Sequence, residues 1–273
     1  MPTEVRKAVV LARGLGTRMR RPDAHAGVDS RQARMAETGM KGMIPIGRPF
    51  MDYLLSALAD SGYREACLVI GPEHQTVRDY YGHELKPSRM HIDFAIQEQP
   101  LGTADAVSAA EGFAGSDRFL VVNSDNLYPL EVLQELRKLE GAGLAGFERE
   151  SLVSEGNLAL ERVRQFPVLQ IDDLGELVDL LEPDEPAALA CDPSAIFVSM
   201  NCWLFGPRIF QACRAIAPSP NGELELPVAV RYAARELKER FRVLKFLKGV
   251  LDLSTRGDIP TVARLLAGRD VHL

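Results

Sequence analysis

Hydrophobic and polar positions follow a regular order along the first half of the chain. Short, continuous apolar runs have the length of strands that are buried on both faces, and they are predicted at 8–12, 67–70, 92–96 and 119–122. Between them, apolar residues three or four positions apart predict helices over 50–58, 73–81, 103–113 and 129–139, the first two closed by Gly62 and Gly82. Strands that alternate with helices predict an α/β fold, in which helices cover both faces of a mostly parallel sheet.

The second half has a weaker pattern. Pro167 and the turn sequence Asp172-Asp-Leu-Gly175 predict a hairpin within 158–181. Beyond it we expect strands at 195–205 and 243–246, and helices at 207–216, 224–237 and 259–266. Trp203 is expected in the core.

Residues 22–40 interrupt the pattern of the first half, because they are polar and have no sustained periodicity. The segment is interpreted either as a surface insertion or as a flexible lid. A lid that closes would bring its arginines toward a bound anion. These are Arg20, Arg21, Arg31 and Arg34.

Composition narrows the class of protein. The 273 residues suffice for one domain with a large core, and the net charge of −6 argues against a general nucleic-acid-binding protein. No signal peptide and no apolar run of membrane-spanning length is found, so a cytoplasmic protein is expected. The four cysteines show no Cys-x-x-Cys spacing and are expected to be free thiols in a reducing compartment. They are Cys67, Cys191, Cys202 and Cys213.

A glycine-rich loop follows the first predicted strand, with the sequence Leu11-Ala-Arg-Gly-Leu-Gly-Thr-Arg-Met19. Gly14 and Gly16 allow backbone conformations in which N–H groups approach an anion closely. Thr17 adds a hydroxyl donor, and Arg18 adds a permanent charge with a planar fork of donors. Such a loop can hold phosphates, although a plain strand-to-helix turn with a solvated arginine has the same sequence pattern.

Three further stretches accompany this loop. They are Lys41-Gly-Met-Ile-Pro-Ile-Gly47, Gln97-Glu-Gln-Pro-Leu-Gly-Thr-Ala-Asp-Ala106 and Val121-Val-Asn-Ser-Asp-Asn126. Together with Gly14-Leu-Gly-Thr-Arg18, and in this order, they resemble the sugar-nucleotide pyrophosphorylase family, from about residue 5 to residue 265. The resemblance implies a Rossmann-like fold in one domain over 1–273, with a nucleotide-binding half at about 5–150 and a sugar-binding half at about 151–273.

The resemblance also implies a reaction. An oxygen of a sugar 1-phosphate would attack the α-phosphorus of a nucleoside triphosphate and displace pyrophosphate, giving a nucleotide sugar. Because an anion attacks an anion, the protein must neutralise charge and align the partners, and no nucleophilic side chain is needed. The implied partners are these two substrates, with UTP or dTTP favoured and with no nucleic acid or membrane. A homo-oligomer is expected.

Site residues follow from the same resemblance. Arg18 would hold the departing pyrophosphate, and Lys41 the α-phosphate or the attacking phosphate. The third catalytic residue is Asp125, which follows a strand end and suits Mg²⁺, with Asp252 as the second carboxylate ligand. Nucleotide contacts are expected from Leu11, Ala12, Arg13, Gly14, Gly16, Thr17, Gln97, Pro100, Gly102 and Thr103. Sugar contacts are expected from Asn123, Glu182, Asn201 and Glu223.

Some positions leave alternatives open. Arg13 stands where the family carries alanine or glycine, so its side chain either contacts the nucleotide or points away. Glu223 and Glu225 either lie near the sugar, as the resemblance implies, or stand in the first turn of a helix, where glutamates are favourable. No lysine follows Glu182, where the family often has one near the sugar phosphate.

Two other functions fit the sequence less well than the transferase. A nucleotide-binding regulatory relative without turnover would need fewer charges than Arg18, Lys41, Asp125 and Asp252 supply. An NAD(P) oxidoreductase is disfavoured, because the loop lacks the third glycine of the dinucleotide-binding pattern and no acidic residue ends a second strand about twenty positions on.

Overall fold

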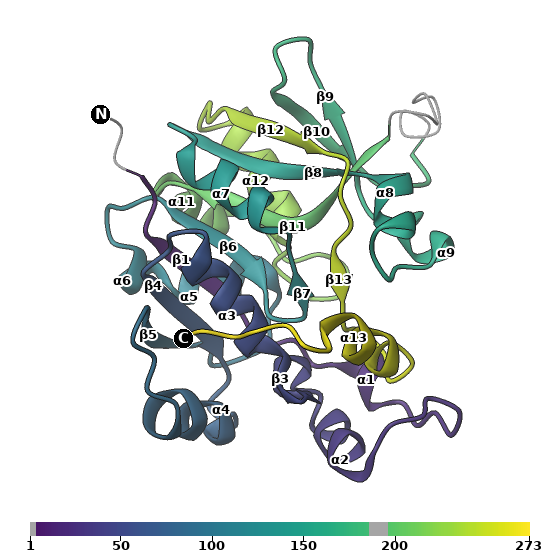
Figure 1. Cartoon of the computed structure of the whole chain (residues 1–273). Coiled ribbons are helices and arrows are strands. Elements are labelled where there is room, and N and C mark those ends of the chain that lie inside the picture. The colour runs from purple at the N-terminus through teal and green to yellow at the C-terminus, as the bar shows by residue number, and fades with distance from the viewer. Residues whose placement is uncertain (1–3, 186–195) are drawn as a thin grey trace.

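The computed structural model describes residues 4–185 and 196–273, and its centre is a nine-stranded sheet (Figure 1). The strand order is β10-β9-β11-β6-β1-β4-β5, with β8 paired to both β11 and β12. Its strands are β1 (Lys7–Leu11), β4 (Glu65–Ile70), β5 (His91–Ile96), β6 (Phe119–Asn123), β8 (Ala142–Glu148), β9 (Val168–Ile171), β10 (Leu177–Leu181), β11 (Phe197–Phe205) and β12 (Phe241–Phe246). The β1, β4, β5 and β6 strands are parallel, as are β8 and β12, whereas β11 runs antiparallel to β6, β8 and β9. The predicted α/β fold with a mixed, mostly parallel sheet is confirmed.

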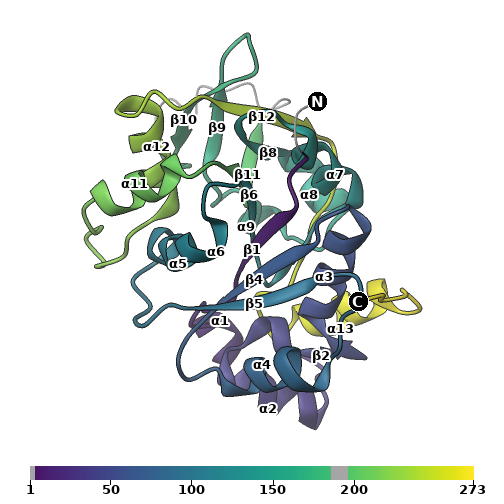
Figure 2. The ribbon, with the colours of Figure 1, turned by 90° about the vertical axis from the view of Figure 1, so that its left-hand side faces the viewer.

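Helices cover both faces of the sheet, as the turned view shows (Figure 2). One layer holds α3 (Phe50–Asp60), α7 (Leu130–Lys138) and α13 (Asp258–Leu266), and the other holds α5 (Thr103–Ala109), α6 (Glu111–Ala114), α11 (Arg208–Ala215) and α12 (Leu226–Arg235). Strand β1 contributes side chains to the cores on both faces of the sheet, because alternate residues of a strand point to opposite faces. Ala8 and Val10 pack in the core under the first layer, whereas Val9 and Leu11 pack in the core under the second.

Shorter elements connect these layers and lie near the ends of the strands. They are α1 (Thr17–Arg20), α2 (Ser30–Thr38), η1 (Lys41–Met43), β2 (Pro45–Ile46), β3 (Arg48–Pro49), α4 (Gln75–Asp79), η2 (Tyr80–Glu84), β7 (Asn126–Leu127), α8 (Arg149–Ser154), α9 (Leu160–Val163) and β13 (Leu251–Asp252). The hairpin predicted within 158–181 is formed by β9 and β10.

The segment 22–40 contains a helix that its apolar pattern did not predict. Asp29 and Gln32 form a capping box at the start of α2, and Gly39 ends the helix in the left-handed conformation. Ala36 is the one buried residue of α2, so the helix has almost no apolar face. The capping pattern, rather than hydrophobic periodicity, was the usable signal here.

Other predictions needed correction. The helix predicted over 73–81 is α4 followed by a π-helical turn, η2, and Gly82 lies inside that turn instead of closing a helix. The helix predicted over 103–113 is divided at Ala110 into α5 and α6. Strand β8 was not predicted, because Gly143 and Gly146 interrupt the run of apolar side chains that identified the other strands. Small residues are required there, since a Cβ at Gly143 would lie 2.5 Å from the Arg242 carbonyl oxygen.

The described cysteines are free and buried, as predicted, and Cys191 lies outside the described residues. Burial raises the pKa of the Cys67 and Cys213 thiols to about 12, so both are protonated at neutral pH. Trp203 is fully buried in the core. Within 4–185 and 196–273, none of the helices combines the length and the apolar character that crossing a membrane requires.

A buried carboxylate fixes α3 to the turn η2. Asp52 is fully buried and accepts hydrogen bonds from the hydroxyls of Tyr81 at 2.7 Å and Tyr80 at 2.9 Å. The Arg48 Nε also donates to it, at 2.9 Å. Burial, together with the Asp52 charge, raises the pKa of Tyr81 well above its ordinary value. The carboxylate is therefore fully partnered, and its removal would leave several donors without an acceptor.

We predict that Asp52→Ala lowers the free energy of unfolding by about 3 kcal/mol in urea denaturation, because breaking a buried, hydrogen-bonded ion pair is strongly destabilising. The control is Asp60→Ala on the same helix. Asp60 pairs with Arg89 at 2.6 Å, but both side chains are more than a third exposed, so a loss below about 1 kcal/mol is expected. Equal losses for the two variants would contradict this account.

Candidate functional site

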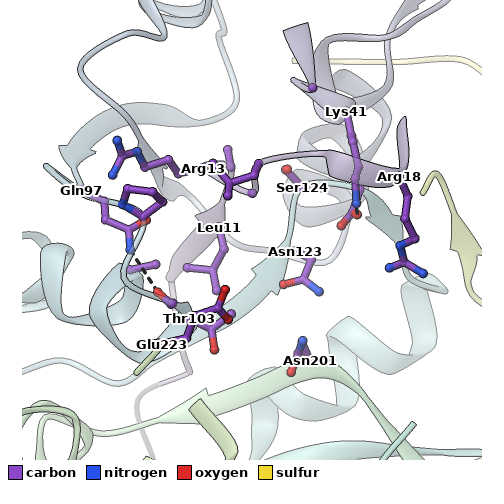
Figure 3. Close-up of a pocket in the computed structure, with 18 residues that line it drawn as sticks. Leu11, Arg13, Arg18, Lys41, Gln97, Thr103, Asn123, Ser124, Asn201 and Glu223 are labelled. Carbon is purple, nitrogen blue, oxygen red and sulfur yellow. Dashed lines mark hydrogen bonds and ion pairs between the residues drawn. The ribbon is translucent and has the colours of Figure 1, made fainter. Parts of the chain in front are cut away.

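Two adjoining cavities lie beyond the carboxyl ends of β1 and β6, the edge at which parallel α/β sheets bind ligands, and Figure 3 shows the residues that line the larger one. The larger cavity has a volume of about 320 Å³ and the smaller about 230 Å³. Side chains from both halves of the chain line the two together. The residues shared by both cavities are Arg18, Thr103, Asn123, Asp125 and Asn201.

Most of the predicted site residues line the larger cavity. They are Leu11, Ala12, Arg13, Gly14, Arg18, Lys41, Gln97, Pro100, Gly102, Thr103, Asn123, Asp125, Asn201 and Glu223. Asp252 lines the smaller cavity. Gly16, Thr17 and Glu182 line neither.

The glycine-rich loop is anchored to both strands next to β1. The Ala12 N–H donates to the Val69 carbonyl at 2.9 Å, and the Ser124 N–H donates to the Leu11 carbonyl at 3.1 Å. Gly16 has a φ of +60°, and any side chain there would collide with the backbone of Gly39. Gly16 therefore lets the start of α1 approach the end of α2, and its predicted contact with the nucleotide stays a prediction.

Arg18 is the exposed cation at the junction of the cavities. Its side chain lies at the opposite end of the larger cavity from Arg13 (Figure 3). Among residues 4–185 and 196–273, the Arg18 guanidinium has no hydrogen-bond or ion-pair partner. A free planar fork of donors at this position suits the binding of a phosphate group.

Lys41 and Asp125 form an ion pair across the loop. The Lys41 Nζ lies 2.7 Å from Asp125 Oδ2, and both side chains are largely buried. Asp125 follows the end of β6, as predicted, but Lys41 begins the 3₁₀ turn η1 instead of entering a strand. The pair keeps a lysine and a carboxylate together at the junction of the cavities.

Asp252 is brought beside Asp125 by the short pairing of β13 with β7, in which Asp252 lies opposite Asn126. The Asn126 Nδ2 donates to Asp252 Oδ2 at 2.9 Å, and Arg162 Nη1 lies 2.7 Å from Asp252 Oδ1. Burial raises the pKa of Asp252, and the charge of Asp125 raises it further. Two carboxylates that repel each other in a partly dry site are a place for a cation.

These donors fit a hard divalent cation. Both carboxylates line the smaller cavity, and Asp252 Oδ1 accepts no hydrogen bond of normal geometry despite its contact with Arg162. In the described part of the chain no three or more His, Cys, Asp or Glu side chains are grouped to hold a metal. The residues therefore suit an ion that completes its coordination with water and phosphate oxygens.

Gln97 and Arg13 lie together at the other end of the larger cavity (Figure 3). The Gln97 Nε2 donates to the Gly102 carbonyl at 3.0 Å and to Asp105 Oδ2 at 2.8 Å. Both of its N–H groups are thereby used, which leaves Oε1 as the atom that can bind a ligand. The amide is thus oriented as a hydrogen-bond acceptor.

Arg13 is buried beside this acceptor, with an exposed fraction of 8 %. Its Nη2 makes a long contact of 3.3 Å with Glu73, while Nε and Nη1 are buried without a hydrogen-bond partner in the described structure. The Arg13 side chain lines the larger cavity, and its contact with the nucleotide stays a prediction. Unpartnered buried donors are unfavourable, and a ligand that accepts from them would relieve that cost.

Gly102 makes a close backbone contact with the loop before α12 and so holds this loop at the wall of the larger cavity. It has a φ of +109°, and a Cβ there would lie 2.5 Å from the Leu224 carbonyl oxygen. The Leu224 N–H in turn donates to the Leu101 carbonyl at 2.6 Å. As a result, Glu223 lines the larger cavity together with Asn123 and Asn201, and it does not line the smaller one.

Asn201 reaches the cavities through an irregularity in β11. Ser199 pairs with Gly146 and Trp203 with Leu144, so β11 advances four residues while β8 advances two. Asn201 sits in this bulge with a φ of +53°, a conformation that asparagine tolerates better than most residues. The bulge turns the side chain toward the junction with Asn123 (Figure 3).

Some predicted residues are not brought into the site. Glu182 is exposed just after β10, and its N–H donates to the side chain of Glu185. Glu225 precedes α12 and makes no capping hydrogen bond with its side chain. Arg20 donates to the Thr38 carbonyl at 2.7 Å, and neither it nor Arg21, Arg31 or Arg34 lines either of these two cavities.

Arg162 is the charged residue that the sequence analysis missed. It projects from α9 into the smaller cavity, next to Asp252 and Ser254. The surrounding segment carries no motif, and α9 is a single turn. The position of Arg162 in the cavity follows from its contact with Asp252, which is distant in the sequence and therefore cannot be predicted from a local pattern.

Known proteins share features of this sequence and this fold. The family model described as "Nucleotidyl transferase" matches residues 25–252. The nucleotidyltransferase Agl11 of low-salt glycan biosynthesis in Haloferax volcanii is 28% identical over 232 residues, which cover 82% of this chain and 56% of that protein. UTP–glucose-1-phosphate uridylyltransferase AglF of the same organism is 27% identical and covers 82% of both chains.

A glucose-1-phosphate thymidylyltransferase of Streptomyces griseus is 29% identical, and the match covers 83% of this chain and 56% of the relative. The chain thus spans little more than half of the length of two of these three relatives. Among solved structures, UDP-glucose pyrophosphorylase complexed with UDP-glucose has the same fold, with a TM-score of 0.74, 19% identity, and coverage of 97% of this chain and 100% of that one.

Proposed function

The chain belongs to the nucleotidyl transferase family, and from this premise we propose that it transfers a nucleoside monophosphate from a nucleoside triphosphate to a sugar 1-phosphate. The products are a nucleotide sugar and pyrophosphate. The observation that carries the proposal is the junction of two cavities at Arg18 and Asp125, flanked by Lys41 and Asp252. Two ligands bound in these cavities would meet beside charges suited to phosphate chemistry.

The larger cavity is proposed to hold the triphosphate. Its base would lie at the end with Arg13 and Gln97, and its phosphates would follow the glycine-rich loop toward Arg18. Gln97 Oε1 offers an acceptor and Arg13 offers donors. In uracil and thymine an N–H group lies between two carbonyl oxygens and matches this pair, so UTP or dTTP is the proposed substrate. The names of AglF and of the thymidylyltransferase relative support this choice.

The smaller cavity is proposed to hold the sugar 1-phosphate, with Asn123 and Asn201 at the junction. A phosphate oxygen of this acceptor attacks the α-phosphorus, a new P–O bond forms, and the bond from the α-phosphorus to the bridging oxygen of pyrophosphate breaks. Arg18 stabilises the pyrophosphate as its charge increases. Lys41 exchanges Asp125 for the α-phosphate or the attacking phosphate, since its Nζ already lies at the junction.

Asp125 and Asp252 are the proposed ligands of Mg²⁺, on the fit of their oxygen atoms described above. When bound, the ion would supply positive charge and fix the geometry of the phosphate oxygens. The pairing of β7 with β13 already holds both carboxylates in place, which spares the enzyme the cost of arranging them during the reaction.

The halves of the chain divide between the two substrates in this proposal. Residues from about 5 to 150 supply most of the wall of the larger cavity, and residues beyond 151 supply much of the smaller one. A lid role for 22–40 remains a proposal that rests on the exposed arginines of this segment. The comparisons give no support to a relative without turnover, which would bind the triphosphate and release no pyrophosphate.

We predict that Asp125→Asn abolishes turnover, with a loss of kcat of at least about 1000-fold, because it removes one ligand charge at the junction and the partner of Lys41. The measurement is pyrophosphate release with a sugar 1-phosphate and Mg²⁺. Circular dichroism should show an unchanged fold, since the amide has the same shape. Turnover near the wild-type rate would rule out the assignment of Asp125.

A second prediction concerns Arg13→Met. Replacing a buried cation with unpartnered donors should raise the free energy of unfolding by about 1–2 kcal/mol in the free protein, while the matched variant Arg18→Met, at an exposed cation, should leave it unchanged. In kinetics, Arg13→Met should lower kcat/KM for UTP or dTTP by roughly 10- to 100-fold and for ATP by much less. Equal losses with every triphosphate would show that Arg13 does not distinguish bases.

A further inference from the structure

The smaller cavity has an unusual charge arrangement for a site that takes a phosphate. Among the described residues that line it, the carboxylates Asp125 and Asp252 face two cations, Arg18 and Arg162. Arg18 also lines the larger cavity, and in the proposed function it serves the pyrophosphate end of the triphosphate. A second dianion, on the acceptor, therefore needs a second cation, and Arg162 is in position to supply it.

The placement of Arg162 is rigid although its helix is short. Its side chain is 18 % exposed, its Nη1 lies 2.7 Å from Asp252 Oδ1, and its Nη2 donates to the Ser254 hydroxyl. Asp258 lies 3.9 Å away, at the start of α13. Residues of β13 and of the segment that follows it thus hold the guanidinium at the wall of the cavity.

Arg162 has N–H donors that these contacts leave unused. A guanidinium has five N–H groups, and the hydrogen bond to Ser254 and the ion pair to Asp252 account for two of them. The Nε atom is buried and has no hydrogen-bond partner in the described structure. A ligand with several acceptor oxygens would satisfy these donors, and a phosphate group has that chemistry.

The ion pair with Asp252 does not prevent Arg162 from binding an anion. Asp252 is a proposed ligand of Mg²⁺, and a divalent cation there would take over its neutralisation. The positive charge of Arg162 would then face the acceptor. In the free protein the ion pair with Asp252 keeps the same charge from standing alone in a partly buried site.

We propose that Arg162 binds the phosphate group of the acceptor sugar phosphate and positions it for attack, an inference that rests on the proposed function of the smaller cavity. Arg162 is thereby the residue that distinguishes a phosphorylated acceptor from the free sugar. A purely structural role, holding Asp252, would instead affect both substrates together.

The test compares Arg162→Gln with the control Arg164→Gln. Arg164 is an exposed cation two residues away that lines neither cavity, so the control removes the same charge from the same segment. Binding of glucose, galactose, mannose and N-acetylglucosamine 1-phosphates is measured by calorimetry with Mg²⁺, alongside binding of UTP and dTTP. For the sugar phosphate that the wild type binds best, Arg162→Gln should raise Kd roughly 10- to 100-fold and leave the triphosphate Kd unchanged. The control should change neither value.

Kinetics separate this inference from the proposed function. If the wild type forms a nucleotide sugar, KM for the sugar phosphate should rise in Arg162→Gln and KM for the triphosphate should not. Unchanged affinity for the sugar phosphate, or equal losses for both substrates, would overturn the inference while the proposed function stands. A wild type that binds a sugar phosphate through Arg162 without turnover would overturn the proposed function alone. A wild type that binds no sugar phosphate overturns the inference.

Arg162→Lys covers the case in which the glutamine variant does not fold. The lysine keeps a charge for Asp252 but loses the planar fork. Its affinity for the sugar phosphate should fall by roughly 5- to 20-fold at an unchanged affinity for the triphosphate. Wild-type affinity in a folded Arg162→Lys variant, as judged by thermal unfolding, would contradict a bidentate contact with phosphate.

Discussion

The site depends on one short antiparallel pairing. Strands β7 and β13 are two residues each, yet their register sets Asp252 opposite Asn126 and so brings a carboxylate from near the C-terminal end beside Asp125. Two carboxylates in a partly buried place repel each other, and the protein offsets this with Lys41 on one and Arg162 on the other. The free protein therefore holds a balanced set of charges, in which each cation lies at the proposed place of a phosphate group.

The sheet explains why this set faces a cavity. The parallel strands β1 and β6 end at the same edge, which places the glycine-rich loop and Asp125 side by side. The antiparallel strand β11 carries a bulge around Asn201, and residues of this bulge line the smaller cavity. Two adjoining cavities thus lie where the parallel and antiparallel parts of the sheet meet.

Sequence patterns predicted the parallel half well, because its strands are continuous apolar runs and its helices bury one face. They also singled out Arg18, Lys41 and Asp125, which follow strand ends or glycine turns and which the structure brings to the wall of one cavity. They failed where the determining contact is distant. Strand β8 needs glycines against its neighbours, α2 depends on its caps, and Arg162 has meaning only through Asp252. Glu182 lines neither cavity, and Glu223 lines only the larger one, because the contact of Gly102 with Leu224 fixes its loop.

The central claim is that a triphosphate and a sugar 1-phosphate react directly at the junction of the two cavities. The most direct measurement is pyrophosphate release with Mg²⁺ across a grid of triphosphates and sugar 1-phosphates, with every product identified by mass. We expect one nucleotide sugar that contains the intact sugar phosphate, formed with UTP or dTTP. Binding of a triphosphate without release of pyrophosphate from any pair would contradict the account and leave the protein as a nucleotide-binding member of its family.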